Sequence, residues 1–135
     1  VVYLPALDRI YTASTTSEPM RDGQVIRASR RDRLEGANIL TTKANMLPEK
    51  WPGGVPEITR SFRASLAYRM CLAAEGRFDG MLTLRDAWEW DIAAGDAVLR
   101  AAGGIVNTLD GAVLRYGKAD FANPHFAAWG TTTAV

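Results

Sequence analysis

The segment from Trp88 to Gly104 constrains the fold more than any other part of this chain. Apolar or small residues recur there at the spacing of one helix face, at Ile92, Ala94, Ala97, Val98, Ala101 and Ala102. Gly103 and Gly104 supply the left-handed stop that commonly ends a helix. Because most of its side chains are small, the sequence predicts a helix from Asp91 that packs closely against its neighbours.

Asp91 is predicted to stand at a buried start of this helix. An Asp at that place can accept hydrogen bonds from the free N–H groups of the first turn, and its charge suits the positive end of the helix dipole. The same N–H groups favour anionic ligands. Two interpretations therefore stay open for Asp91: a plain helix cap, or a carboxylate that binds a ligand.

Composition limits the class of protein. A chain of 135 residues with 47% hydrophobic content has the size and core of one compact domain. The net charge of +1 argues against an extended nucleic-acid surface. Cys71 is the single cysteine, which excludes an internal disulfide and fits a reducing compartment, so a cytoplasmic location is expected. It is expected to be a small core residue.

Two further features of the sequence argue against a zinc site and against a membrane-spanning segment. The single histidine, His125, has no Cys or second His beside it, so zinc is not expected. The sequence contains no run of about eighteen apolar residues, so no membrane span is expected.

The first 35 residues predict a hairpin followed by a connector. Val1–Pro5 and Asp8–Ala13 form two strands with Ala6 and Leu7 in the turn, and such a hairpin needs a larger sheet to join. Residues 14–35 are polar and are expected to be a solvated connector, with one short strand at 24–28. A cluster of basic residues in this segment offers the alternative of a phosphate or partner site; it comprises Arg27, Arg30, Arg31 and Arg33.

Strands and helices alternate in the rest of the chain. Strands are predicted at 37–42, 58–63, 78–84, 104–109 and 126–130, with a brief helical turn at 46–51 and a return strand at 112–116 after an Asp110–Gly111 turn. This alternation indicates an α/β fold in which ligands bind beyond the carboxyl ends of strands.

A second helix is predicted from Ser65 to Gly76. Ser65 is a suitable N-cap and Gly76 a suitable stop. An apolar stripe along this segment indicates core packing rather than a cofactor site; it comprises Leu66, Ala67, Met70, Cys71 and Ala74. Arg69 lies off the centre of the stripe, so its side chain is free to lean over the start of the helix.

Arg85 follows the strand predicted at 78–84 and precedes Asp91. A guanidinium at a strand end can bind a phosphate through two hydrogen bonds. The alternative is an ion pair with Asp86 or Glu89 at the surface, and both interpretations stay open.

The segments Trp90–Gly95 (Trp-Asp-Ile-Ala-Ala-Gly) and Ala101–Gly104 (Ala-Ala-Gly-Gly) resemble the second motif of the inositol monophosphatase superfamily of magnesium-dependent, lithium-sensitive phosphatases. The spacing between the two parts matches that motif without a gap. In this superfamily the Asp after the Trp is a metal ligand. The resemblance therefore implies that Asp91 binds Mg²⁺.

The resemblance also implies a fold: the C-terminal lobe of the layered αβαβα inositol monophosphatase/fructose bisphosphatase architecture, with a mixed sheet and flanking helices. Residues 1–35 would be a hairpin and connector belonging to an N-terminal lobe, and residues 36–135 the C-terminal α/β lobe. The superfamily's first metal motif, Asp-Pro-x-Asp-Gly-Thr, is absent from the sequence. We therefore expect the chain to be the C-terminal half of a longer enzyme and inactive by itself.

Three further residues are implied to bind substrate. The segment from Ser65 resembles the superfamily helix that follows a Gly-Ser or Gly-Thr turn near the substrate, although Ala64 replaces the usual Gly. Arg69, two positions before Cys71, matches a basic residue of the bisphosphate nucleotidase branch. With Arg85, these residues would hold the ribose or second phosphate of a nucleotide.

The chain end favours the same branch. Leu114–Lys118 together with Asn123–Phe126 looks like the ending of bacterial 3′(2′),5′-bisphosphate nucleotidases, whereas Leu84 replaces the Glu with which inositol-specific enzymes hold a ring hydroxyl. The implied reaction is magnesium-dependent hydrolysis of 3′-phosphoadenosine 5′-phosphate to AMP and phosphate. The alternatives are an inositol, histidinol or sugar phosphatase of the same superfamily, and a non-catalytic binding module. A small phosphorylated substrate is the expected partner, and a homodimer is worth testing because members of the superfamily often form dimers.

Overall fold

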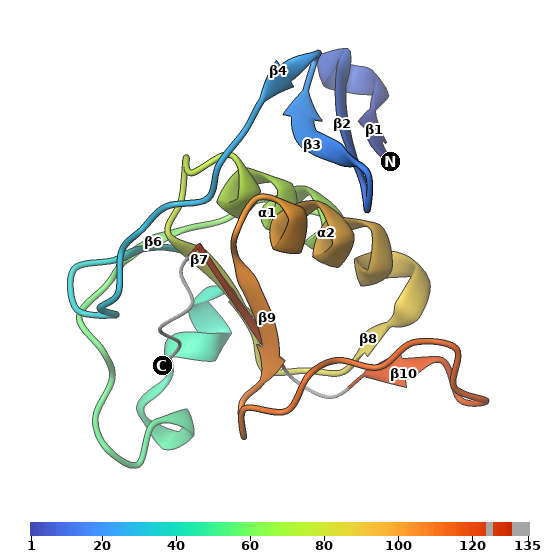
Figure 1. Ribbon diagram of the computed structural model, residues 1–135. Coiled ribbons are helices and arrows are strands. Elements are labelled where there is room, and N and C mark those ends of the chain that lie inside the picture. The colour runs from blue at the N-terminus through green and yellow to red at the C-terminus, as the bar shows by residue number, and fades with distance from the viewer. Residues whose placement is uncertain (124–125, 131–135) are drawn as a thin grey trace.

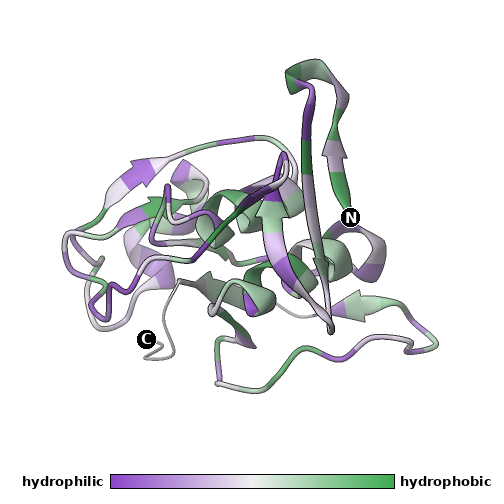
Figure 2. Cartoon of the chain, turned by 45° about the horizontal axis from the view of Figure 1, so that its top comes forward, coloured by the Kyte–Doolittle hydropathy of each residue, from purple (hydrophilic) through white to green (hydrophobic). Residues whose placement is uncertain are grey.

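The computed structural model describes residues 1–123 and 126–130. A four-stranded sheet and a five-stranded sheet lie on opposite sides of a layer formed by α1 (Leu66–Ala74) and α2 (Glu89–Ala101) (Figure 1). Hydrophobic residues are prominent in these central helices (Figure 2). The predicted α/β class is confirmed.

The N-terminal sheet is an antiparallel meander of β1 (Val2–Leu4), β2 (Arg9–Ser14), β3 (Ser17–Arg21) and β4 (Gln24–Val25). The predicted hairpin is confirmed, with the 3₁₀ turn η1 (Pro5–Leu7) between its strands.

The expectation of a solvated connector was wrong for β3. The connector was expected because residues 14–35 are polar. Although Pro19 cannot donate a ladder hydrogen bond, it lies in β3, where it is buried and its carbonyl accepts from Ile26 N at 3.0 Å. Residues 26–37 do form a connector without strands. Within it, Arg27 forms an ion pair with Glu18, and Arg31 donates to main-chain carbonyl groups. These contacts favour a structural role for both arginines over a phosphate site.

The five-stranded sheet is mixed, as the sequence resemblance implied. β5 (Asn38–Leu40) is parallel to both β6 (Thr59–Ser61) and β7 (Gly80–Thr83). β11 (Phe126–Trp129) is antiparallel to β7 and to β9 (Ile105–Thr108). Each of these strands was predicted, although each is shorter than expected. The predicted turn at 46–51 is also confirmed, as η3 (Pro48–Lys50), and is preceded by η2 (Lys43–Met46).

Small residues allow the two helices to approach closely, as predicted. A Cβ atom added at Gly95 of α2 would lie 2.9 Å from the Cβ of Met70 on α1. Gly76 ends α1 with a φ of +72° and lies against the backbone of Arg27. The helices thus pack backbone against side chain, with no room for a larger residue at Gly95.

One core joins all three layers. Val2 and Tyr11 of the N-terminal sheet are buried in the same cluster as Met70 of α1, Leu99 of α2 and Phe126 of β11. The expected core position of Cys71 is confirmed, with no exposed surface. Residues 1–35 therefore pack on the same core as the remainder, and their assignment to a separate lobe stays a prediction.

One prediction about the second half of the chain was wrong, and one feature there was not predicted. The return strand at 112–116 does not form: the Asp110–Gly111 turn is present, but beyond it only a single bridge joins Asn107 to Val113. Tyr116 turns away instead, and its hydroxyl donates to Asp96 of α2 at 2.6 Å. An unpredicted pair of short strands, β8 (Ala87–Trp88) and β10 (Ala122–Asn123), lies beside the start of α2.

Within residues 1–123 and 126–130, no helix has the length and apolar character needed to cross a membrane. His125, for which zinc binding was not expected, lies outside the described residues.

Candidate active site

The start of α2 is held by a loop that comes from far along the chain. Glu89 N donates to the carbonyl of Phe121 at 2.9 Å. The Glu89 carboxylate accepts from Gly117 N at 2.7 Å, from Lys118 N at 3.2 Å and from Lys118 Nζ at 3.1 Å. These hydrogen bonds, the one from Gly117 above all, lower the pKa of Glu89. Glu89 is therefore bound to the 117–121 loop and does not pair with Arg85, which removes one of the alternatives for Arg85.

Asp91 lies in the first turn of α2 but is not its cap. The helix begins two residues earlier than predicted, with Trp88 at the N-cap, and the Asp91 side chain is exposed rather than buried. The helix begins at Glu89 because the 117–121 loop binds both the Glu89 backbone N–H and its carboxylate. Among the described residues, the Asp91 carboxylate makes no hydrogen bond or ion pair. The Asp91 carboxylate is therefore exposed at the N-terminal end of the helix, where the helix dipole favours its negative charge. It is available to bind a cation.

Ser65 caps α1, as predicted. Its Oγ accepts a hydrogen bond from Tyr68 N at 3.3 Å, and its backbone has a φ of +64°, a left-handed conformation that is costly for residues other than glycine. The turn thus forms with Ala64 in place of the usual Gly, because Ser65 adopts the unusual conformation. The hydroxyl is exposed and still has its own proton to donate.

Arg69 is buried and lacks a carboxylate partner among the described residues. Its side chain is 6% exposed, its guanidinium lies 4.7 Å from the centre of the Phe62 ring, and its Nε donates to the carbonyl of Arg63. Burial, and then the positive charge of Arg85, lower the pKa of Arg69. The two predicted substrate-binding arginines are thus close enough to repel each other. An anion near both would relieve this repulsion.

The stacking of Arg69 on Phe62 could not be predicted, because it depends on the left-handed turn at Ser65 between them. Arg85 itself is exposed on the link from β7 to β8. The charge of Arg85 thus acts on Arg69, while Ser65 is the N-cap of α1 and Asp91 lies in the first turn of α2. Glu89 and Phe62 join the site as residues that sequence reasoning did not propose.

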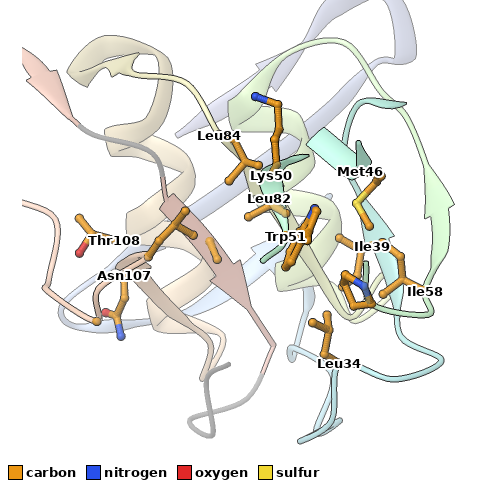
Figure 3. A pocket seen from close by; sticks show the side chains of 14 residues that line it. Leu34, Ile39, Met46, Lys50, Trp51, Ile58, Leu82, Leu84, Asn107 and Thr108 are labelled. Atoms are coloured by element: carbon orange, nitrogen blue, oxygen red, sulfur yellow. The ribbon is translucent and has the colours of Figure 1, made fainter. Parts of the chain in front are cut away.

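A separate apolar cavity of about 220 Å³ lies on the other face of the five-stranded sheet (Figure 3). Side chains alternate along a strand, so Leu40 and Met81 point to the helices while Ile39 and Leu82 line this cavity. Leu84 also lines it, and none of the predicted site residues does. The cavity is therefore distinct from the candidate active site.

The described residues fit a magnesium ion only in part. Mg²⁺ prefers oxygen ligands in octahedral geometry and often keeps several waters beside one or two carboxylates. Asp91 offers one such carboxylate, but no group of three or more His, Cys, Asp or Glu side chains in the described part of the chain is placed to hold a metal. These residues supply one ligand of a metal site, not a complete one.

Comparisons with known proteins show the family to which this chain belongs. The model of the inositol monophosphatase family matches residues 1–133. A protein encoded in the pss 5′ region of Rhizobium leguminosarum bv. phaseoli is 54% identical over 46% of this chain and 72% of the relative. The putative Nus factor SuhB of Neisseria meningitidis serogroup B is 30% identical over 95% of this chain and 52% of the relative.

Solved structures show the same fold. The suhB protein of Bartonella henselae, 26% identical, superposes with a TM-score of 0.74 over 97% of this chain and 52% of its own. A staphylococcal IMPase-II, 17% identical, has been solved with two ligands. The structure with 2′AMP bound has a TM-score of 0.75 and covers 95% of this chain and 49% of its own. The structure with inositol monophosphate bound has a TM-score of 0.77 and covers 97% of this chain and 50% of its own.

This chain spans about half the length of the SuhB and IMPase-II proteins that it matches. The match to the family model extends over nearly all of its residues and includes the helix that carries Asp91. The chain belongs to the inositol monophosphatase family.

Proposed function

We propose that these residues form part of a magnesium-dependent phosphomonoesterase that hydrolyses 3′-phosphoadenosine 5′-phosphate to AMP and phosphate. The observation that carries the proposal is the buried Arg69 guanidinium, which has a second positive charge near it and no carboxylate partner among the described residues. Burial of an uncompensated charge is costly, and a bound phosphate would remove that cost.

Arg69 and Arg85 would bind and orient the phosphate that is not cleaved. Guanidinium groups offer paired N–H donors that match phosphate oxygens. The exposed Ser65 hydroxyl would donate to the same ligand or to its ribose. Because Arg69 is fixed by Phe62 and by the Arg63 carbonyl, it would meet the ligand in a preset orientation.

Asp91 would supply one oxygen ligand to Mg²⁺, and the other ligands would come from outside the described residues. When bound, Mg²⁺ ions in enzymes of this class activate a water molecule and relieve the charge on the leaving oxygen. Since one carboxylate does not complete such a site, we expect these 135 residues to bind the nucleotide without hydrolysing it.

Two observations favour a nucleotide over an inositol phosphate. Leu84 is apolar and lines the cavity on the far face of the sheet, so it offers no hydrogen bond to an inositol hydroxyl. The staphylococcal neighbour also binds a nucleotide, 2′AMP. Inositol monophosphate is bound to the same neighbour, which makes inositol phosphate the main competing substrate.

Phosphate release by the gene product that contains these residues tests the proposal. It should be measured with Mg²⁺ for 3′-phosphoadenosine 5′-phosphate, inositol 1-phosphate, histidinol phosphate and a sugar phosphate. We expect the highest kcat/KM for the nucleotide. A higher value for another substrate would move the assignment within the family, and no hydrolysis of any of them would favour a non-catalytic binding module.

A further inference from the structure

Three large aromatic side chains form an exposed cluster at the start of α2, which we call the aromatic platform: Trp88, Trp90 and Phe121. The rings of Trp88 and Trp90 stack with centroids 5.2 Å apart and planes 10° from parallel. The Phe121 ring lies 6.0 Å from that of Trp90. Trp90 is 65% exposed, so much of its surface is open to a ligand.

Backbone hydrogen bonds hold the residues of the platform in place. β8 and β10 pair Trp88 with Ala122, and Glu89 N donates to the carbonyl of Phe121. Phe121 has a φ of +50°, a left-handed conformation that costs a bulky residue about 1–3 kcal/mol and persists only where the surroundings impose it. The backbone is thus held in an unfavourable conformation that places a phenyl ring beside an exposed indole. Such local strain is concentrated at binding and active sites.

Packing within the fold does not account for the platform. All three of its residues are among the exposed large hydrophobic side chains, at 49% for Trp88, 65% for Trp90 and 47% for Phe121. Single exposed apolar residues need no explanation, but a contiguous exposed group marks a ligand or partner surface. Flat aromatic faces favour a flat ligand, and nucleobases stack on such faces regardless of their sequence identity.

The charged residues near the platform indicate which groups a flat ligand would carry. Asp91 follows Trp90 directly, and Arg85 lies three residues before Trp88. One short stretch of the sequence therefore contains two exposed indoles, an exposed guanidinium and the carboxylate that is proposed to bind Mg²⁺. A nucleotide carries the matching groups, namely a base and phosphates.

We propose that the aromatic platform stacks the base of a nucleotide whose phosphate lies toward Arg85. This inference rests on the proposed function and deepens it, because it assigns recognition of the base to Trp88, Trp90 and Phe121. A second copy of the chain or a nucleic-acid strand would be a competing occupant.

Indole N–H signals in NMR spectra of the chain test the proposal. The chain has four Trp residues, and Trp51 lines the cavity on the far face of the sheet, so it serves as an internal reference. AMP is expected to shift the Trp88 and Trp90 signals and to leave Trp51 unchanged, whereas ribose 5-phosphate, which lacks a base, shifts neither. Equal shifts with both ligands, or no shift with AMP, would overturn the proposal. So would signals that change with protein concentration but not with AMP, or that respond only to an oligonucleotide.

Matched variants separate stacking from folding. Trp90→Ala should weaken AMP binding about five-fold or more, since a stacked base contributes roughly 1–3 kcal/mol, while Trp90→Phe should retain most of the affinity. Tyr3→Ala removes a similarly exposed aromatic ring from β1, 54% exposed, and should leave AMP binding unchanged. Equal AMP affinity in Trp90→Ala and the parent chain would contradict the platform.

The same variants distinguish this inference from the proposed function. If the gene product binds AMP through Trp90 but hydrolyses no nucleotide, the phosphatase proposal fails and the platform stands. If it hydrolyses 3′-phosphoadenosine 5′-phosphate with the same KM in Trp90→Ala, the platform fails and the phosphatase proposal stands.

Discussion

Arg85 lies near enough to the buried guanidinium of Arg69 that its positive charge adds to burial in lowering the pKa of Arg69. Two like charges close together are unfavourable, and an anion that binds both would remove that cost. Under the proposed function, this pair of arginines is where the uncleaved phosphate would bind.

Inorganic phosphate should stabilise the chain through this pair. Binding to the folded state at ten times Kd adds about 1.4 kcal/mol to the free energy of unfolding. The Tm should therefore rise in phosphate relative to chloride at equal ionic strength. Arg85→Ala should abolish most of that rise, whereas Arg115→Ala, which removes another exposed arginine, should preserve it. An equal rise in both variants would exclude a specific site.

The stability of the chain should fall in acid because of Glu89. Hydrogen bonds from Gly117 and Lys118 lower its pKa below the ordinary value of 4.5, so its contribution is complete above that pH and is lost as the pH falls through the lowered value. Glu89→Gln should be less stable than the parent at neutral pH, with a difference that shrinks below pH 4.5. Urea unfolding at several pH values measures this, and Glu49→Gln, at an exposed acid on η3, should show no such change.

Gly95→Ala should destabilise the chain although alanine favours helices. The added Cβ would lie 2.9 Å from the Cβ of Met70, so α1 and α2 must separate at a cost of about 1–3 kcal/mol. Gly53→Ala is the matched control, because no atom lies within 4 Å of a Cβ added there. A Gly95→Ala variant as stable as the parent would show that the helices do not pack as described.

Cys71 should be unreactive in the folded chain. Burial raises the pKa of its thiol to about 12, and thiolate is the reactive form. A thiol reagent at neutral pH should label it only after unfolding in denaturant. Rapid stoichiometric labelling of the native chain would contradict the buried position.

Sequence reasoning predicted the elements whose pattern is local. The apolar stripe that contains Met70 and the Gly-Gly stop after α2 were sufficient to predict both helices, and the N-terminal hairpin followed from two strand-forming segments on either side of a short turn. Sequence reasoning failed where contacts between residues far apart in the chain determine the secondary structure. β3 contains Pro19 and is stabilised by pairing on both sides, and α2 begins at Glu89 because a loop 28 residues further along binds that carboxylate.

The candidate site also contains some residues that the sequence predicted and some contacts that it did not. Arg69 was proposed from its match to a basic residue of the bisphosphate nucleotidase branch, and Arg85 from its position at a strand end. In the structure the charge of Arg85 acts on Arg69, and the role of both in binding substrate stays a prediction. The contact of Arg69 with Phe62 and the tilted ring contact of Trp90 with Phe121 involve two residues with positive φ, Ser65 and Phe121. No local pattern predicts such a conformation for Ser or Phe, so these contacts required the structure.

The most direct test of the account is the magnesium dependence of nucleotide hydrolysis by the gene product that contains these residues, compared with its Asp91→Asn variant. We predict that the variant loses at least roughly 10–100-fold in turnover or magnesium affinity, the loss typical when groups that support a metal ligand are changed, while Asp32→Asn, at an exposed acid in the connector, is unaffected. Unchanged turnover and unchanged magnesium dependence in Asp91→Asn would contradict the central claim that this carboxylate holds the metal.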